Sequence, residues 1–396
     1  KMSDDKVVIV SAKRTPIGSF QGNFESLKAT ELGSRVIEKN INDISINPKE
    51  IDETIMGCVL PAGLGQAPAR QAAMGAGIPS ESGATTINKM CGSGMKSIMF
   101  GHDSIKAQQN NIVVAGGLEN MTNAPYILSK ARKGFRMGHA DVKDHMFLDG
   151  LEDAYEEGKL MGSFAEDTAE HYQFTREQQD NFAITSLERA KKANEDGTFE
   201  SEIVPIKVLN RKNQIIVNKD EQPFKSDITK IPTLKPAFRK NGTVTAANSS
   251  SISDGASSVI LMLESEAQKR GIKPLARIID HSTNSQEPKW FTTAPIGAIE
   301  KVLEKSGWKK TDVDLFEVNE AFAVVPMAVM KDIGISNDIL NIYGGACALG
   351  HPVGASGTRI VTTLINALKK NNLKKGVASL CIGGGEATAL TLEIIN

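Results

Sequence analysis

The 396-residue sequence lacks the features of a membrane-spanning, disulfide-stabilised or nucleic-acid-binding protein. No apolar stretch approaches the roughly 20 residues that a membrane-spanning helix requires. The net charge is only −1, so we expect neither nucleic acid nor an anionic membrane as a partner. Its 4 cysteines are scattered without a C-x-x-C pair, which argues against both a disulfide framework and a metal site. These absences favour a soluble protein of a reducing compartment, and the expected location is cytoplasmic.

Length and composition predict more than one compact unit. The chain is 40% hydrophobic and 23% charged, as globular proteins are, and it is longer than one hydrophobic core usually supports. Short β-branched runs such as Val7–Val10 and Ile112–Gly117 alternate with helical patterns such as Leu27–Asn40. This alternation predicts an α/β fold with parallel strands in both outer thirds of the chain.

The middle third differs from the two outer thirds. It is polar and irregular, with one clear helix from Thr175 to Glu195 that begins in a capping-box pattern. The outer thirds share a weak repeat. Each contains a predicted helix followed by a strand that ends in glycine, and the helices begin at Cys91-Gly92-Ser93-Gly94 and at Gly354-Ala355-Ser356-Gly357. Chance similarity between two α/β halves would give the same pattern.

Three glycine-rich segments carry residues suited to nucleophilic catalysis. Cys91 lies among small residues at the predicted start of a helix, whose free N–H groups would lower the pKa of the thiol from about 8.5 toward 7. His351 lies in the glycine-rich run Gly344–Gly357, and Cys381 ends an apolar run just before Gly383-Gly384-Gly385. A cysteine, a histidine and a second cysteine in such settings favour covalent catalysis with separate acid–base groups. An inert buried thiol is the alternative for each cysteine alone.

These segments resemble the thiolase family, and within it the acetoacetyl-CoA thiolases, along essentially the whole chain. The resemblance rests on short strings that occur in the family's order: Ser11–Gly18, Gly65–Ala73, Asn88–Lys96, Val318–Phe322, Gly344–Gly357 and Cys381–Gly385. It implies a thiolase-like α/β fold of two similar βαβαβ-type halves in layers α/β/α/β/α, with an inserted loop domain. The expected limits are 1–119 and 248–270 for the N-terminal half, 120–247 for the loop domain, and 271–396 for the C-terminal half.

The resemblance also implies an activity, that of an acetyl-CoA C-acetyltransferase. Such enzymes join two acetyl-CoA molecules into acetoacetyl-CoA and CoA through an acyl-enzyme, or run the reverse cleavage. Cys91 would carry the acyl group, His351 would activate its thiol, and Cys381 would move the α-proton. Asn319 would hold a water, and the backbone N–H groups of Cys91 and Gly383 would stabilise an oxyanion. No cofactor is expected beyond the CoA thioester substrates. A 3-ketoacyl-CoA thiolase of broader chain length in fatty-acid β-oxidation is the alternative.

Further residues match, by position, the thiolase residues that contact CoA. Those expected to line the tunnel for its pantetheine arm are Met161, Phe238, Ala246, Ser250, Phe291, Ala321 and Phe322. Lys225 and Lys230 are candidates for its phosphates, although loop lysines are usually just solvated.

Two positions depart from the family pattern. Leu160 replaces a histidine of many short-chain thiolases, and Glu386 either raises the pKa of Cys381 by repulsion or points elsewhere.

The resemblance predicts a homotetramer built as a dimer of dimers, with Ile127–His145 as a tetramer-forming loop that has no helical or strand period. A ketoacyl-synthase-type condensing enzyme is a second possibility, and Cys381 in place of a second histidine argues against it. A non-catalytic carrier is a third, and the intact set of catalytic residues argues against that. The remaining histidines are predicted to be ordinary surface or core residues, namely His102, His139, His145, His171 and His281.

Overall fold

Most strands lie in one mixed sheet whose two ends come from the two outer thirds of the chain. The computed structural model describes residues 5–210 and 213–395. The strand order is β12-β13-β14-β11-β1-β10-β5-β3-β4, with β2 paired to β10. The bounds are β1 Val7–Arg14, β2 Gly18–Ser19, β3 Glu53–Gly57, β4 Gly83–Ile87, β5 Val113–Asn120, β10 Ser253–Leu263, β11 Ala276–Ser285, β12 Leu315–Val318, β13 Lys375–Ile382 and β14 Glu386–Ile394. The halves join through a short pairing of β1 with β11, at Val8↔Arg277 and Ile9↔Ala276.

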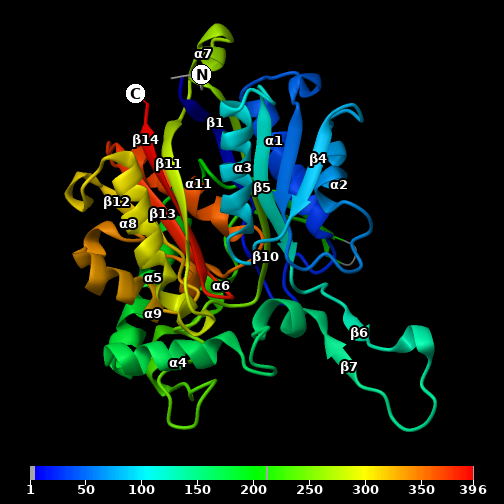
Figure 1. Ribbon diagram of the computed structural model, residues 1–396, viewed down its shortest axis with the longest axis vertical. Helices are drawn as coiled ribbons and strands as arrows, with labels where there is room; N and C mark the ends of the chain where they lie inside the picture. The colour runs from blue at the N-terminus through cyan, green and yellow to red at the C-terminus, as the bar shows by residue number, and fades with distance from the viewer. Residues whose placement is uncertain (1–4, 211–212, 396) are drawn as a thin grey trace.

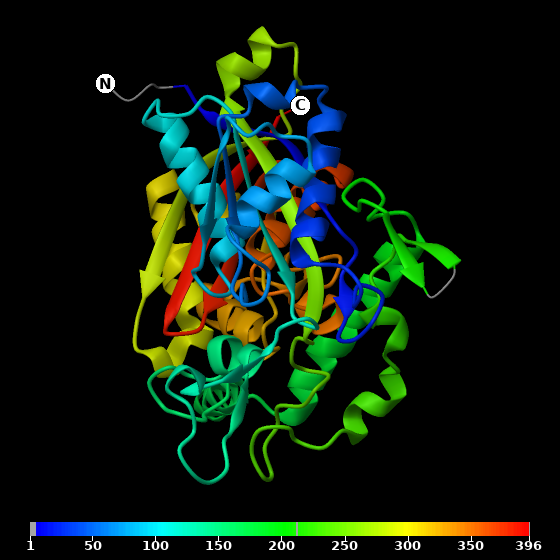
Figure 2. The same cartoon turned by 90° about the vertical axis from the view of Figure 1, so that its right-hand side faces the viewer.

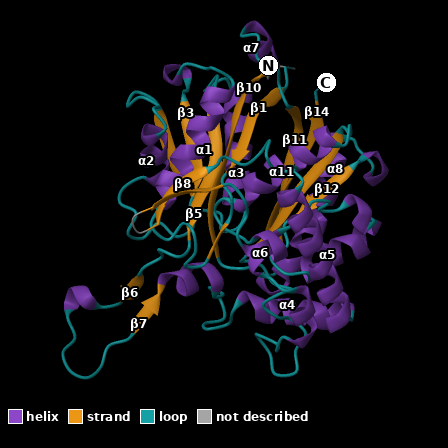
Figure 3. Ribbon diagram, turned by 180° about the vertical axis from the view of Figure 1, so that it is seen from behind, coloured by secondary structure: helices purple, strands orange, loops and turns teal. Residues whose placement is uncertain are grey.

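Helices cover the outer faces of the sheet and fill the space between its two halves, as Figures 1 and 3 show. Their bounds are α1 Ala29–Asp43, α2 Pro68–Gly75, α3 Ser93–Lys106, α4 Met161–Tyr172, α5 Arg176–Glu195, α6 Gln222–Lys225, α7 Glu264–Lys269, α8 Ala294–Ser306, α9 Val324–Val329, α10 Ala346–Leu349 and α11 Ser356–Lys370. In the described part of the chain, no helix combines the length and the apolar character needed to cross a bilayer.

The prediction of parallel strands holds for only part of each half. Strand β3 runs parallel to β4 and β5, and β12 runs parallel to β13. The other pairs within the large sheet are antiparallel. Parallel neighbours need a crossover segment, and here α3 leads into β5 as α11 leads into β13. Both halves therefore contain the same strand–helix–strand unit, which the weak sequence repeat indicated.

Alternating strand side chains divide the core into layers. Val8 of β1 packs in a cluster with α1 and α2, whereas Val7 faces a central cluster that includes α3 and α11. In β13, Ala378 faces the same central cluster and Val377 faces a third one with α8 and α9. Because successive strand residues point to opposite faces, each half of the sheet needs helices on both sides. The order of layers is the predicted α/β/α/β/α.

Most of the segment between β5 and β10 gathers at one end of the sheets, drawn in green in Figures 1 and 2. Its residues Ile206, Val208 and Val217 instead pack in the cluster of α1 and α2. Its helix α5 begins with the predicted capping box, because the Thr175 hydroxyl accepts from the Gln178 N–H at 3.1 Å. The same segment contains two hairpins, β6 Tyr126–Leu128 with β7 Val142–Asp144, and β8 Ile206–Asn210 with β9 Asn213–Val217. The sequence analysis expected no strand near Ile127–His145, and strands of three residues are too short to give a detectable period. The four-part division of the chain stays a prediction.

One buried carboxylate connects loops from the two halves. Glu119 in β5 accepts backbone N–H groups from Val59 at 2.9 Å, Leu60 at 3.0 Å and Gly354 at 2.9 Å. Val59 and Leu60 follow β3, whereas Gly354 lies just before α11. Burial raises the pKa of Glu119 to about 7, although the three N–H donors lower it. One side chain thus fixes the loop beside β3 against the loop that carries His351.

We expect Glu119→Gln to lower the free energy of unfolding by about 2–3 kcal/mol. Oε1 accepts from Leu60 and Oε2 from Val59 and Gly354, so an amide group turned either way leaves a buried N–H without an acceptor. Urea denaturation followed by circular dichroism measures the change. The exposed Glu188→Gln is the matched control, with a change within about 0.5 kcal/mol. Equal urea midpoints for the wild type and Glu119→Gln would contradict the role of Glu119.

Candidate active site

Cys91 lies in a tight turn immediately before α3. Met90 has a φ of +46°, a left-handed conformation that is uncommon for a residue with a side chain. Gly92 is the N-cap of α3, and a Cβ there would lie 2.3 Å from Cδ1 of Ile382. The missing side chain at Gly92 therefore leaves room for Ile382 at the end of β13. The turn and the missing side chain bring Cys91 against the strand that carries Cys381.

The Cys91 thiol is a neutral group at neutral pH. Burial raises its pKa to about 11, although hydrogen bonds from the N–H groups of Gly383 and of Cys91 itself lower it. The prediction that the pKa falls toward 7 is wrong. The free energy needed to desolvate a thiolate is larger than the stabilisation that the helix start and the two N–H groups give it. Such a thiol needs a base at the moment of attack.

His351 provides a neutral imidazole. Its Nδ1 pairs with the Ser356 hydroxyl, which in turn donates to the Pro352 carbonyl at 3.1 Å. This arrangement assigns the ring proton to Nδ1 and leaves the lone pair on Nε2. Burial, and then the positive charge of Arg359, lower the pKa of His351 to about 3. The imidazole is therefore unprotonated at neutral pH and able to accept a proton.

Asn319 lies just after β12 and faces His351. Its Nδ2 is 3.5 Å from His351 Nε2, and Arg359 Nη2 lies 3.5 Å from its Oδ1. Because the guanidinium has only donors, it turns the amide nitrogen toward the imidazole. The sequence analysis missed Ser356 and Arg359 as positioning residues. The sequence did offer one signal for Arg359, because it lies among the apolar residues that form the buried face of helix α11.

Cys381 is fully buried at the end of β13, close enough to Cys91 for their charges to interact. Burial, and then the charge of Cys91, raise its pKa well above the usual range. Of the two alternatives for Glu386, the structure has the carboxylate pointing elsewhere. It pairs with Lys89 Nζ at 2.6 Å and accepts from Ser285 Oγ at 3.0 Å, and it does not perturb Cys381.

The starts of α3 and α11 pack directly against each other through glycines. A Cβ on Gly57 would lie 2.5 Å from Cβ of Ser93 and 2.9 Å from the Gly354 carbonyl oxygen. A Cβ on Gly357 would lie 2.2 Å from the Met95 nitrogen. No side chain fits at these positions without displacing backbone. Because Cys91 precedes α3 and His351 precedes α11, this packing brings both catalytic segments to one place.

Most residues predicted to line the CoA tunnel gather beside this site. Met161 Sδ lies 3.3 Å from where a Cβ on Gly383 would be. The rings of Phe238 and Phe322 meet edge to face at 6.0 Å, and the Ser250 N–H donates to the Ala321 carbonyl at 2.9 Å. Five of them belong to one apolar cluster or pack against it: Met161, Phe238, Phe291, Ala321 and Phe322.

Among the described residues, no contact joins the remaining CoA candidates to this cluster. Lys225 Nζ pairs with Glu221 at 2.6 Å, and Lys230 Nζ lies 3.7 Å from Asp227 with most of its side chain exposed. Ala246 is exposed. Both lysines are held by carboxylates on their own segments, so their assignment to phosphate binding stays a prediction.

Glu320 supports the site rather than reacting in it. Its buried carboxylate accepts from Ser186 Oγ at 2.7 Å, Asn341 Nδ2 at 3.0 Å and the Cys347 N–H at 3.1 Å. Asn341 also exchanges two 2.8 Å hydrogen bonds with the backbone of Val318. These contacts fix the chain on both sides of Asn319.

We expect iodoacetamide to alkylate Cys91 about tenfold faster for each unit of pH between 7 and 9. A thiol whose pKa is raised to about 11 gains thiolate over this whole interval, and the thiolate is the reacting form. Cys91 retains a partly exposed surface that the reagent can reach. Mass spectrometry of the Cys91 peptide after timed quenching measures the rate. A rate that levels off below pH 8 would contradict the raised pKa.

Comparisons with known proteins give the chain a family. Residues 7–265 match the model of the thiolase N-terminal domain, and residues 272–394 match that of the thiolase C-terminal domain. A probable acetyl-CoA acetyltransferase of Dictyostelium discoideum is 51% identical over 98% of this chain and 94% of its own length. Acetyl-CoA acetyltransferase 2 of Arabidopsis thaliana is 48% identical over 98% of this chain and 97% of its own.

Two solved structures share the fold over nearly the whole length of both chains. The acetyl-CoA acetyltransferase of Bacillus anthracis superposes with a TM-score of 0.97, is 40% identical and covers 100% of each chain. A thiolase of Ascaris suum in complex with coenzyme A superposes with a TM-score of 0.93, is 41% identical and covers 98% of this chain and 100% of its own. With both domain models matched from one end of the fold to the other, this chain belongs to the thiolase family.

Proposed function

We propose that this chain is an acetyl-CoA C-acetyltransferase that joins two acetyl-CoA molecules into acetoacetyl-CoA and CoA, and catalyses the reverse cleavage. The observation that carries the proposal is the arrangement at Cys91. The turn that carries Cys91 lies against Ile382, the residue between Cys381 and Gly383, because a Cβ on Gly92 would be 2.3 Å from Ile382 Cδ1. The two thiols are close enough for their charges to interact. The names of its relatives, which are acetyl-CoA acetyltransferases, support the choice of acyl group.

In the first half-reaction, His351 Nε2 takes the proton of the Cys91 thiol as the sulfur attacks the thioester carbonyl. Its low pKa keeps the imidazole free to accept that proton at neutral pH. The N–H groups of Cys91 and Gly383 donate to the oxyanion, and such a donor is worth about 3–4 kcal/mol in a transition state. The leaving CoA thiolate takes the proton back from the imidazole, and the acetyl group stays on Cys91.

In the second half-reaction, Cys381 removes a proton from the methyl carbon of another acetyl-CoA. A thiolate at Cys91 would raise the pKa of Cys381, and the sulfur of an acetylated Cys91 carries no charge. In the acyl-enzyme, Cys91 therefore does not oppose deprotonation of Cys381. The enolate oxygen accepts a hydrogen bond from a water held by Asn319, and the enolate carbon attacks the acetyl carbon on Cys91. The bond from that carbon to the Cys91 sulfur breaks, the Cys91 thiolate takes the proton that Cys381 removed, and acetoacetyl-CoA leaves.

A 3-ketoacyl-CoA thiolase of broader chain length remains the second candidate on chemical grounds, since both reactions use the same groups. Leu160 precedes Met161 at the edge of the tunnel residues, where short-chain thiolases carry a histidine. The relatives' names favour the acetyl enzyme. Neither reaction requires a cofactor besides the CoA thioesters, and the 4 cysteines, all free, fit a reducing cytoplasm.

We expect Cys381→Ser to separate the two half-reactions. Incubation with acetyl-CoA should still add about 42 daltons to the Cys91 peptide, because acetyl transfer replaces one hydrogen by CH3CO. Condensation should fall by about 10²–10⁴, since a serine hydroxyl is a far weaker base than a thiol. Mass spectrometry reports the adduct, and release of CoA reports condensation.

The Cys91→Ala variant is the control and should lose both the adduct and condensation. Exchange of the acetyl methyl protons with deuterated water should fall in parallel with condensation in Cys381→Ser. Normal exchange in that variant, or an adduct on Cys58 or Cys347, would overturn the assignment.

We further propose a homotetramer built as a dimer of dimers. Two features support it. Strand β4 ends the sheet order, so one of its edges is free to pair with a second copy. The β6–β7 hairpin projects from the body in Figure 1 and carries exposed apolar side chains, namely Tyr126, Leu128, Phe135, Met137 and Val142. Exposed apolar groups on a projecting hairpin favour contact with another subunit.

We expect light scattering to give the mass of four chains for the wild type and of two chains for Leu128→Asp combined with Val142→Asp. These residues face each other across the hairpin, so two carboxylates there would repel an apolar partner surface. Leu209→Asp, an equally exposed site on another hairpin, is the control and should stay tetrameric. A wild-type mass of one chain at micromolar concentration would reject the proposal.

A further inference from the structure

We propose that His102, Asp103 and His281 form a binding site for a divalent transition-metal ion such as Zn²⁺. The site lies away from the CoA chemistry, and no step of the proposed reaction uses it. His102 and Asp103 belong to α3, and His281 belongs to β11. The sequence analysis took both histidines for ordinary ones, because 178 residues separate Asp103 from His281 and no spacing motif links them.

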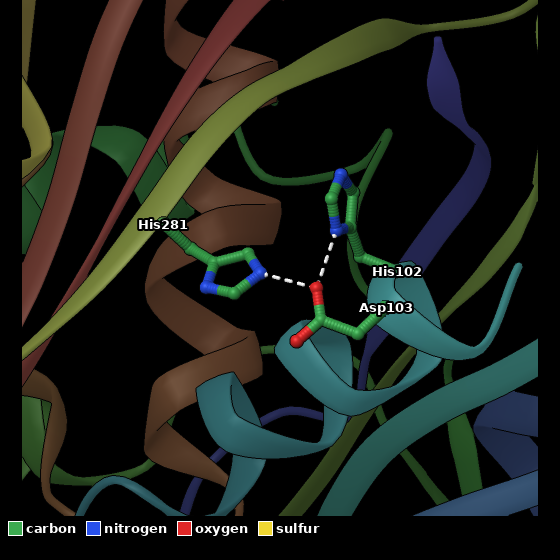
Figure 4. Close-up of side chains that lie close together, drawn as sticks. All are labelled: His102, Asp103 and His281. Carbon is green, nitrogen blue, oxygen red and sulfur yellow. Dashed lines mark hydrogen bonds and ion pairs between the residues drawn. The ribbon is translucent and has the colours of Figure 1, made fainter. Parts of the chain in front are cut away.

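The three side chains converge on one point, as Figure 4 shows. His102 Nδ1 lies 2.9 Å and His281 Nε2 lies 2.8 Å from the same oxygen, Oδ1 of Asp103. One ligand atom from each residue lies within 4.8 Å of the other two. The two rings meet edge to face with centroids 5.0 Å apart, so both nitrogens approach the carboxylate from different directions.

The two distances from nitrogen to the carboxylate oxygen are close to those of a tetrahedral site, and the two nitrogens lie within 4.8 Å of each other. Zinc bonds of about 2.0–2.1 Å to nitrogen and oxygen place neighbouring ligand atoms about 3.3 Å apart. The carboxylate oxygen must therefore move by only about half an ångström from each nitrogen to admit the ion. Asp103 has 57% of its side chain exposed and can rotate, whereas the side chains of His102 and His281 are only 15% and 13% exposed.

Two lysines act on the cluster from outside it. The backbone of His281 is fixed by Lys305 Nζ, which donates to its carbonyl at 2.6 Å and pairs with Asp280 at 2.7 Å. Lys96 is the cation whose charge interacts with Asp103, and it weakens the site without occupying it.

Two imidazoles and one carboxylate match the preference of Zn²⁺, Co²⁺ and Ni²⁺ for nitrogen with oxygen, rather than that of Ca²⁺ or Mg²⁺ for oxygen alone. Three protein ligands leave the fourth position to water at the exposed side of Asp103. A bound ion would connect α3, in the N-terminal domain match, with β11, in the C-terminal domain match. Binding to the folded chain would therefore hold the two halves together and raise the unfolding temperature.

The test is calorimetric titration of the full chain, first dialysed against EDTA, with ZnCl2. We expect saturable uptake at the cluster and a higher unfolding temperature in the presence of zinc. His281→Gln and Asp103→Asn should each weaken this binding at least tenfold and abolish the thermal shift. The exposed His139→Gln is the matched control and should bind as the wild type does. Both cluster variants should keep their rate of CoA release from acetyl-CoA, which verifies that they fold.

Cobalt distinguishes this cluster from the catalytic thiols, which also bind soft metals. Co²⁺ held by nitrogen and oxygen gives visible ligand-field bands, whereas a thiolate ligand adds an intense near-ultraviolet charge-transfer band. We expect the visible bands alone, present in Cys91→Ala and lost in His281→Gln. The proposal is overturned if wild-type protein takes up neither ion, if His281→Gln binds zinc as tightly as the wild type, or if Co²⁺ shows only a thiolate band that Cys91→Ala removes.

Discussion

The contact between the two halves at Glu119 is the constraint on which the site depends. Its carboxylate holds the loop after β3 and the loop that carries His351, and the glycines beside it let the starts of α3 and α11 touch. Burying a carboxylate without hydrogen-bond donors would destabilise the fold by several kcal/mol. The three N–H groups offset that free energy. The geometry between Cys91 and His351, the proposed nucleophile and base, is therefore set by how the two halves pack against each other.

Burial is the second determinant of the chemistry, because it disfavours the charged form of each titratable group in the site. It raises the pKa values of both Cys91 and Cys381 and lowers that of His351. A stored thiolate–imidazolium pair would have to overcome this desolvation. The neutral pair avoids that cost and moves its proton only when an acyl group arrives. The same desolvation strengthens the hydrogen bonds that two backbone N–H groups offer to a developing oxyanion.

The sequence predicts the local elements better than their relations. The capping box of α5 and the helix after Cys91 depend on neighbouring residues, and both are present. The pKa of Cys91 was mispredicted because a helix start is visible in sequence, whereas desolvation depends on apolar clusters to which both halves of the chain contribute. The contacts of Arg359 and Glu119, and the approach of His281 to Asp103, were missed for the same reason, because each joins two segments that only the folded chain brings together. The contact of Ser356 with His351 lies within one segment and depends on the turn that this segment makes.

The arrangement of β1, β10 and β5 has a consequence for the order in which the chain is made. β1 is synthesised well before its long antiparallel partner β10, which follows only after the whole loop segment and also completes the pairing of β5. Until then β1 lacks that partner, and apolar strand edges are prone to wrong pairing. A cell that makes this protein therefore has to protect a nascent half for most of its translation, and the loop segment lengthens that exposure.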